Sequence, residues 1–311
     1  WANVQTSAEK TAESKKLPQE QVSHPLMDSF DKPLLSKDTN TLPISFQKIQ
    51  RFFDHDEETA AFLKKCKSGL LCGDNTKLSL EDEERLGQIL HHCLVKNQAT
   101  TFVLMLLRIL VTQESGPTPY KECVCWIYQN IVKDDSGQQH SKPLRTMSWL
   151  MLSNIAASSQ LWKMEGEEDE WVQAAICAMS DKENCIRQAA AAFCYNTSLL
   201  SASETTETEG LGDTKVSLLC ACLESLEEEM DYTVRLRRLM TVGRIMVTEG
   251  DNAKDLILDL GMDGFVSEQV LVTKKVTCND ESSIGRGDAE TCGELAAELN
   301  LLLHARKRRR E

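Results

Sequence analysis

The sequence is poor in aromatic residues, glycine and proline. Aromatic side chains make up 5% of the 311 residues, and there are 15 glycines and 7 prolines. Apolar residues account for 41% of the chain, with Leu, Ala and Met prominent among them. Helices accept these residues well, whereas sheets favour β-branched and aromatic side chains. The composition therefore favours an all-α protein.

The chain also lacks an excess of basic residues and a long apolar run. Its net charge is −13, which disfavours a broad basic face for nucleic acid or anionic membranes. The longest apolar run, residues 102–111, is interrupted by Arg108 and is shorter than the ~20 residues that span a bilayer. We expect neither a nucleic-acid partner nor a membrane association. Because the chain begins at Trp1, we expect a fragment or a processed form.

No CxxC pair occurs among the twelve cysteines. The two CxC pairs, Cys123/Cys125 and Cys220/Cys222, have no histidine at the spacing of a zinc ligand. Most of the cysteines lie among apolar residues, where a free thiol behaves as a small hydrophobic group. We therefore expect no metal or cofactor, and a reducing compartment, the cytoplasm or the nucleus.

Helical spacing of apolar residues recurs along the chain. Ser79 is an expected N-cap, and an apolar stripe at residues 86, 89, 90, 93 and 94 follows it. Gly250 and Gly261 stand where helices are expected to end. The other expected helices cover about 55–67, 102–111, 119–132, 143–158, 168–180, 183–200, 214–229, 232–248, 252–260 and 292–305.

The remaining segments define the expected domain organisation. Residues 1–41 have little hydrophobic rhythm and are interpreted as a flexible lead or linker, although residues 26, 30 and 34 are apolar. Residues 43–53 are expected to form an extended segment and a turn. Polar loops are expected at about 134–141, 201–213 and 273–290. A single domain over 42–305 and a basic tail over 306–311 complete the chain.

An internal repeat indicates the architecture. Residues 144–154 can be laid over residues 186–196, a shift of 42 positions that superimposes Asn154 on Asn196. A weaker third copy, residues 234–243, has Gly243 in place of the asparagine. A period near 40 in a helical chain is typical of armadillo or HEAT repeats. We expect a right-handed armadillo-like α-solenoid of about six helical repeats with one concave side.

The repeated asparagines are candidates for peptide binding. An amide side chain both donates and accepts, so Asn154 and Asn196 are expected to bond the backbone of an extended peptide in the concave groove. The alternative is that they only satisfy buried polar groups of the solenoid. Arg145 and Arg187, at the helix starts, either contribute to the site or form a solvated face. Each lies nine residues before its asparagine, roughly on the opposite side of the helix.

Several stretches of the chain resemble the PUL domain, the armadillo-like module of the phospholipase-activating protein family of ubiquitin-pathway adaptors. The resemblance covers about residues 42–303 and lies in residues 42–46, 78–82, 187–199, 237–243 and 253–263. It implies a protein-binding module, here a monomer. The implied partner is the acidic C-terminal tail of valosin-containing protein, a hexameric AAA ATPase.

The resemblance also implies which arginines meet the tail. The family's second groove arginine falls on Arg237, and Arg238 and Arg244 are further candidates. The first arginine belongs four residues before Asn154, where this chain has Leu150. Arg145 lies more than one helical turn from that position, so the chain departs from the family there.

Two other interpretations remain open. The chain is alternatively an armadillo-type adaptor or scaffold for a different peptide, in which case the run 306–310 is a nuclear-localisation signal or a solvated tail. It is alternatively the non-catalytic C-terminal part of a thioredoxin-like or cysteine-peptidase enzyme. The six histidines form no recognisable catalytic pattern with the cysteines, so we expect no catalytic residues and no enzymatic activity in this chain.

Overall fold

The structure, a computed structural model, describes residues 25–71, 78–133, 140–158, 168–200, 212–224, 226–264, 266 and 286–304. This described part contains helices and no strand. The α-helices are α1 (Pro25–Ser29), α2 (Leu42–Gln50), α3 (Glu57–Leu71), α4 (Leu80–Val95), α5 (Thr100–Leu110), α6 (Lys121–Ile127), α7 (Lys142–Ala156), α8 (Glu168–Ala178), α9 (Asn184–Leu200), α10 (Asp213–Leu223), α11 (Tyr232–Glu249), α12 (Asp251–Asp259) and α14 (Arg286–His304). The expected all-α class is confirmed.

Most helices lie where their apolar stripes predict them. Ser79 caps α4 by accepting from the backbone N–H of Asp82, and α11 and α12 end beside Gly250 and Gly261, both with positive φ. The helix expected over 119–132 is divided into a 3-10 turn η3 (Thr118–Tyr120), α6 and a π-helical turn η4 (Tyr128–Val132). The helix expected to reach residue 229 ends at Leu223.

The extended segment expected over residues 43–53 was a wrong prediction. These residues form α2 and a 3-10 turn η2 (Arg51–Phe53). Proline is compatible with the first turn of a helix, where its missing N–H is not needed, and Pro43 is in that turn. The buried residues Leu42, Phe46 and Ile49 then follow at helical spacing against the core.

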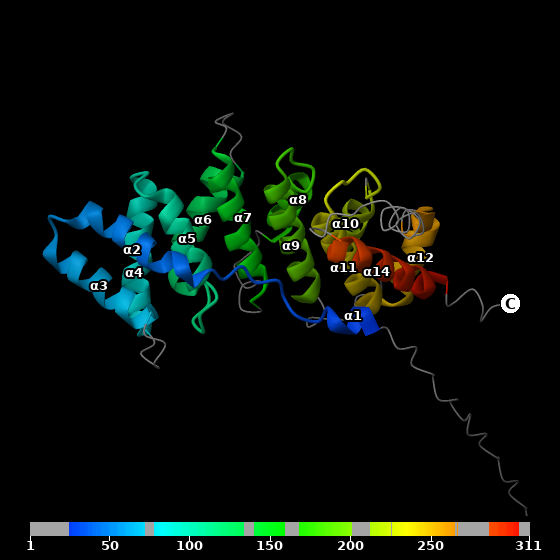
Figure 1. Cartoon of the computed structure of the whole chain (residues 1–311), viewed down its shortest axis with the longest axis horizontal. Coiled ribbons are helices and arrows are strands. Elements are labelled where there is room, and N and C mark those ends of the chain that lie inside the picture. Colours follow the sequence, from blue (N-terminus) through cyan, green and yellow to red (C-terminus); the bar gives the residue numbers. More distant parts are fainter. Residues whose placement is uncertain are drawn as a thin grey trace, which may run out of the picture.

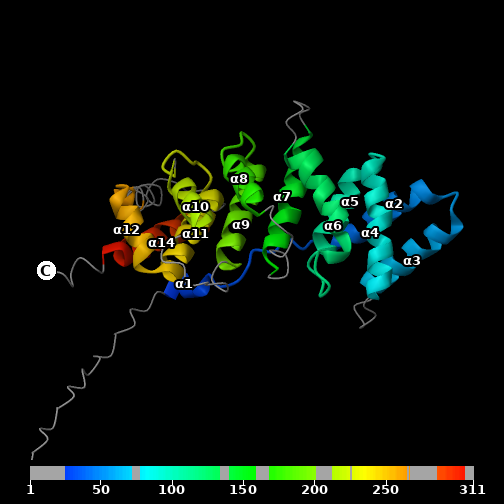
Figure 2. The ribbon, with the colours of Figure 1, turned by 180° about the vertical axis from the view of Figure 1, so that it is seen from behind.

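The helices stack one after another into an elongated body, consistent with an α-solenoid (Figure 1). One row consists of α5, α7, α9 and α11, each packed on the next, with α2 against α5 and α14 against α11. The helices α4, α6, α8 and α10 form a second row, visible from behind in Figure 2. Leu, Ile, Ala and Cys side chains fill the space between the rows in one continuous core. The hand of the stack, the armadillo type and the number of six repeats stay predictions.

Residues 25–41 do not behave as the flexible lead that the sequence suggested. They form α1, an extended stretch and a 3-10 turn η1 (Thr39–Thr41), and cross the face of α5, α7, α9 and α11 (Figure 1). The reason is that side chains of these helices bond the backbone of the segment, as described below. Residues 1–24, the remainder of the expected lead, lie outside the described part.

Four other expected features fall wholly or largely outside the described residues. The polar loops expected at 134–141, 201–213 and 273–290 lie largely in the undescribed ranges 134–139, 201–211 and 267–285. The basic tail, residues 306–311, is likewise not described. No helix of the described residues has the length and apolar character that crossing a bilayer requires.

Candidate functional site

Two asparagines bind the backbone of an extended segment of the same chain. Asn196 accepts from the N–H of Leu34 at 2.7 Å and donates to the carbonyl of Leu34 at 2.9 Å. Asn154 accepts from the N–H of Ser36 at 2.7 Å and donates to its carbonyl at 3.0 Å. Each amide thus satisfies both backbone groups of one residue, and the two residues are two positions apart. This spacing is that of one edge of an extended strand.

The asparagines are oriented by neighbouring turns of the solenoid. The amide nitrogen of Asn154 also donates to the carbonyl of Arg108 on α5, at 2.7 Å. The corresponding nitrogen of Asn196 donates to the carbonyl of Ser153 on α7, at 2.8 Å. Both side chains are almost fully buried. The same geometry recurs after one 42-residue period. Adjacent repeats therefore present their amides to residues of an extended strand that are two positions apart.

Tyr195 adds a third contact, next to Asn196 on α9. Its hydroxyl donates toward the carbonyls of Phe30 at 2.6 Å and Lys32 at 3.2 Å. Burial raises the pKa of Tyr195 to about 12, with Arg244 opposing that rise and Asp31 adding to it. The hydroxyl is therefore a neutral donor at physiological pH, and the charges of Arg244 and Asp31 lie near it.

The segment is closed at its N-terminal end by α14. The backbone N–H groups of Leu26 and Met27 donate to the carboxylate of Glu298, at 3.2 and 3.3 Å. Met27 is buried against α11 at Gly243, where a Cβ would lie 2.4 Å from the Met27 sulfur. Gly243 is the position where the third repeat lacks the asparagine. The missing side chain therefore makes room for Met27.

Arg108 marks the other end. Its guanidinium Nη1 lies 3.3 Å from the hydroxyl of Ser36. Burial lowers the pKa of Arg108, and Asp38 partly counteracts that effect. We call residues 26–38 the docked segment, and we call the surface that holds it the asparagine face. That face is made by Arg108, Asn154, Tyr195, Asn196 and Gly243.

The structure places the other predicted site residues in contacts within the solenoid. Arg187 makes a two-pronged ion pair with Glu229, at 2.8 and 3.0 Å. Arg238 is buried and donates to the carbonyls of Met179 and Glu224. These two arginines connect helices and do not reach the docked segment in any contact of the described part. Their proposed role in partner binding stays a prediction.

Arg237 and Arg244 occupy one stripe of α11, seven residues apart. Arg237 donates to the carbonyl of Gln188 on α9 at 2.5 Å, and burial lowers its pKa, partly countered by Asp231 and Asp288. Neither arginine forms an ion pair with a carboxylate of the described residues. Arg237 thus contacts α9, and Arg244 acts electrostatically on Tyr195 of the same helix.

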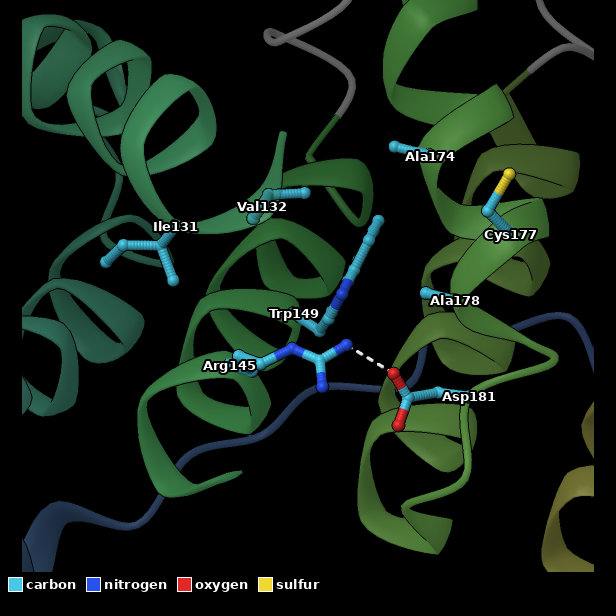
Figure 3. Close-up of a pocket in the computed structure, with 8 residues that line it drawn as sticks. All are labelled: Ile131, Val132, Arg145, Trp149, Ala174, Cys177, Ala178 and Asp181. Atoms are coloured by element: carbon cyan, nitrogen blue, oxygen red, sulfur yellow. Dashed lines mark hydrogen bonds and ion pairs between the residues drawn. The ribbon is translucent and has the colours of Figure 1, made fainter. Parts of the chain in front are cut away.

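Arg145 lies apart from the asparagine face, at a small pocket shown in Figure 3. Its guanidinium pairs with Asp181, so that α7 and the residues after α8 are joined across the pocket. The pocket has a volume of about 170 Å³. It is lined by Ile131, Val132, Arg145, Trp149, Ala174, Cys177, Ala178 and Asp181. Leu150, the departure from the PUL pattern, is partly buried against the core.

The cysteines of the described part are free thiols. Burial raises the pKa of Cys66, Cys93 and Cys222 to about 11, so these thiols are neutral and weakly nucleophilic near pH 7. In the same ranges of the chain, no three His, Cys, Asp or Glu side chains gather in an arrangement suited to a metal ion.

Sequence reasoning found the asparagines but missed Arg108, Tyr195, Glu298 and the docked segment itself. Tyr195 precedes Asn196 directly, and the repeat alignment places Ser153 opposite it, so the repeat carries no signal for the tyrosine. Comparison of the chain with protein-family models, curated proteins and solved structures gave no match. The geometry of the asparagine face is therefore the basis on which a function can be proposed.

Proposed function

We propose that this chain is a protein-interaction module that binds an extended peptide on its asparagine face. The observation that carries the proposal is the pair of amide clamps by which Asn154 and Asn196 hold Ser36 and Leu34. These clamps bond backbone atoms alone. Any extended peptide offers the same N–H and C=O groups at every second residue, so a partner strand would satisfy them equally well.

The charge of the docked segment indicates the kind of partner. Asp38 counteracts the lowering of the Arg108 pKa, and Asp31 raises the pKa of Tyr195, so two acids of the docked segment act electrostatically on groups of the solenoid. The docked segment thus carries acids that act on Arg108 and Tyr195 of the face. An extended acidic peptide from a partner would place its own acids there.

The resemblance to the PUL domain then selects the partner. We propose the acidic C-terminal tail of the AAA ATPase valosin-containing protein, bound by a monomer of this chain in the cytoplasm or nucleus. Arg237 and Arg244 lie two helical turns apart on α11, about 10 Å along its axis. Arg237 has a carbonyl partner and no ion-pair partner among the described residues, so it is available for a carboxylate.

The docked segment must leave for the tail to use the amide clamps. A tethered peptide competes at an effective concentration that reaches the millimolar range. The apparent affinity for a free tail peptide is therefore the intrinsic affinity of the face multiplied by the fraction of molecules in which the segment is undocked.

The test is calorimetric titration with the C-terminal decapeptide of valosin-containing protein from the same organism, with a scrambled decapeptide as the control peptide. Arg237→Ala should weaken binding tenfold or more, because a charged hydrogen bond contributes ~1.5–3 kcal/mol. Arg51→Ala is the matched control variant, since Arg51 is exposed on η2, outside the asparagine face. Equal affinities of the Arg237 and Arg51 variants would refute the role of Arg237.

A second variant tests the competition. Leu34→Pro removes the N–H that Asn196 accepts and should release the docked segment locally. The tail should then bind more tightly than to the unchanged chain. If the decapeptide binds neither form while circular dichroism shows intact helices, the tail is not the partner, and an adaptor for a different peptide becomes the better interpretation.

A further inference from the structure

Arg108 is a buried arginine whose charge is not matched by a carboxylate. It is 5% exposed, and although Asp38 acts on it electrostatically, no carboxylate of the described residues forms an ion pair with it. Its Nε has no hydrogen-bond partner there, and its Nη1 contacts the Ser36 hydroxyl at 3.3 Å and the Met147 sulfur at 3.8 Å. A buried cation is strongly disfavoured unless an anion or several acceptors compensate it. The guanidinium thus lacks an anion in direct contact with it.

The group nearest to that charge is a hydroxyl that can be modified. Ser36 is held by Asn154 through its backbone, so the position of its side chain relative to Arg108 is fixed in the docked state. The residue is only partly buried, which leaves its oxygen room to carry a larger group toward solvent. A phosphate there would bring a charge of −1.5 to −2 and three acceptor oxygens to the guanidinium.

We propose that Ser36 is a phosphorylation site and that Arg108 is the receptor of the phosphate, so that phosphorylation locks the docked segment on the asparagine face. The proposal concerns the segment and does not depend on which partner the face binds. Phosphorylation would reduce access of any competing peptide, because the clamps of Asn154 and Asn196 remain occupied.

The modification requires a protein kinase and a nucleoside triphosphate. The Ser36 oxygen attacks the γ-phosphorus, the bond to the bridging oxygen of the diphosphate breaks, and the hydroxyl proton passes to the base of the kinase. Both backbone groups of Ser36 are bonded to Asn154 in the docked state, so the kinase would act on molecules whose segment is transiently undocked. The phosphorylated segment then returns and pairs with Arg108.

The test compares the chain carrying genetically encoded phosphoserine at position 36 with the unmodified chain, by hydrogen–deuterium exchange. The readout is the Leu34 amide, which donates to Asn196 and is two residues from the modification. Its protection should rise about tenfold to a hundredfold, the effect of a charged hydrogen bond. The gain should shrink as salt is raised, because ions screen the pair.

Two comparisons separate this effect from others. Phosphoserine at Ser29, an exposed residue of α1 whose hydroxyl donates to the Leu26 carbonyl, should give no gain. Arg108→Gln should abolish the gain of phosphoserine 36. An unchanged Leu34 amide, or a gain that persists in Arg108→Gln, would overturn the proposal. If Arg108→Gln does not fold, a gain in the unsubstituted chain that is the same in 1 M salt would overturn it.

Discussion

The amide clamp of Asn196 offers the most direct test of how the docked segment is held. Asn196→Ala removes the acceptor for the Leu34 N–H and the donor for its carbonyl, together with the bond to Ser153. Each bond to the segment contributes ~1 kcal/mol net. Docking should therefore weaken by about 2 kcal/mol, which is roughly thirtyfold in the docking equilibrium. The Ser153 carbonyl also loses a buried partner, so the solenoid should lose a further ~1–3 kcal/mol.

The assay is hydrogen exchange at the Leu34 amide, combined with urea unfolding of the whole chain. Asn130→Ala is the matched control, because Asn130 is an exposed asparagine on η4 that donates only to the local carbonyl of Trp126 among the contacts described. Exchange at Leu34 should accelerate in the Asn196 variant and stay constant in the Asn130 variant. Unchanged Leu34 exchange in Asn196→Ala would show that the clamp does not hold the segment.

Two further perturbations have outcomes that the contacts determine. Gly243→Ala puts a Cβ 2.4 Å from the present position of the Met27 sulfur, so Met27 should be displaced. Hydrogen peroxide should then oxidise Met27 several-fold faster, while the helical circular dichroism is retained. An unchanged oxidation rate would contradict the assigned packing. Asp231 caps α11 by accepting from the Val234 N–H. Burial is the largest single influence on the pKa of Asp231 and raises it, but hydrogen bonds from Val234, Asn184 and Gln188 together outweigh burial and lower this pKa. A lowered folded-state pKa gives stability that is present above the ordinary value near 3.8 and is lost as pH falls through the folded value. Asp231→Ala should therefore cost about 1–2 kcal/mol at pH 7 in urea unfolding, and this cost should shrink as the pH falls below the ordinary value near 3.8. A difference that is independent of pH would refute the ionic cap.

Local patterns in the sequence were sufficient to predict most helices and the two asparagines. The stripe of α4 follows from apolar residues at helical spacing, and Ser79 follows from the capping preference. The 42-residue shift brings Asn154 and Asn196 to equivalent positions, and each bonds the backbone of an extended segment. Their partner differs from the expectation, because residues 34 and 36 of the same chain occupy the clamps.

Contacts between distant parts of the chain left no such pattern. The docked segment pairs Leu34 with a residue 162 positions away, and its bonds use backbone atoms, which every residue possesses. Nothing in residues 26–38 therefore distinguishes them from a linker except a few apolar side chains. In the sequence Arg108 is only an interruption of an apolar run, because its contact is with Ser36, 72 positions earlier.

The order in which the docked segment meets its contacts has a consequence for synthesis of the chain. Leu26 is made early, but its partner Glu298 follows 272 positions later. At 5–20 residues per second, about 15–55 seconds pass between the two. During that interval α7 and α9 can already present Asn154 and Asn196, while the segment lacks its anchor on α11 and α14. The first part of this segment to leave the ribosome is thus the last to be fixed. Until α14 is made, the segment covers the clamps without its N-terminal anchor, so that other extended polypeptides compete with it there more readily.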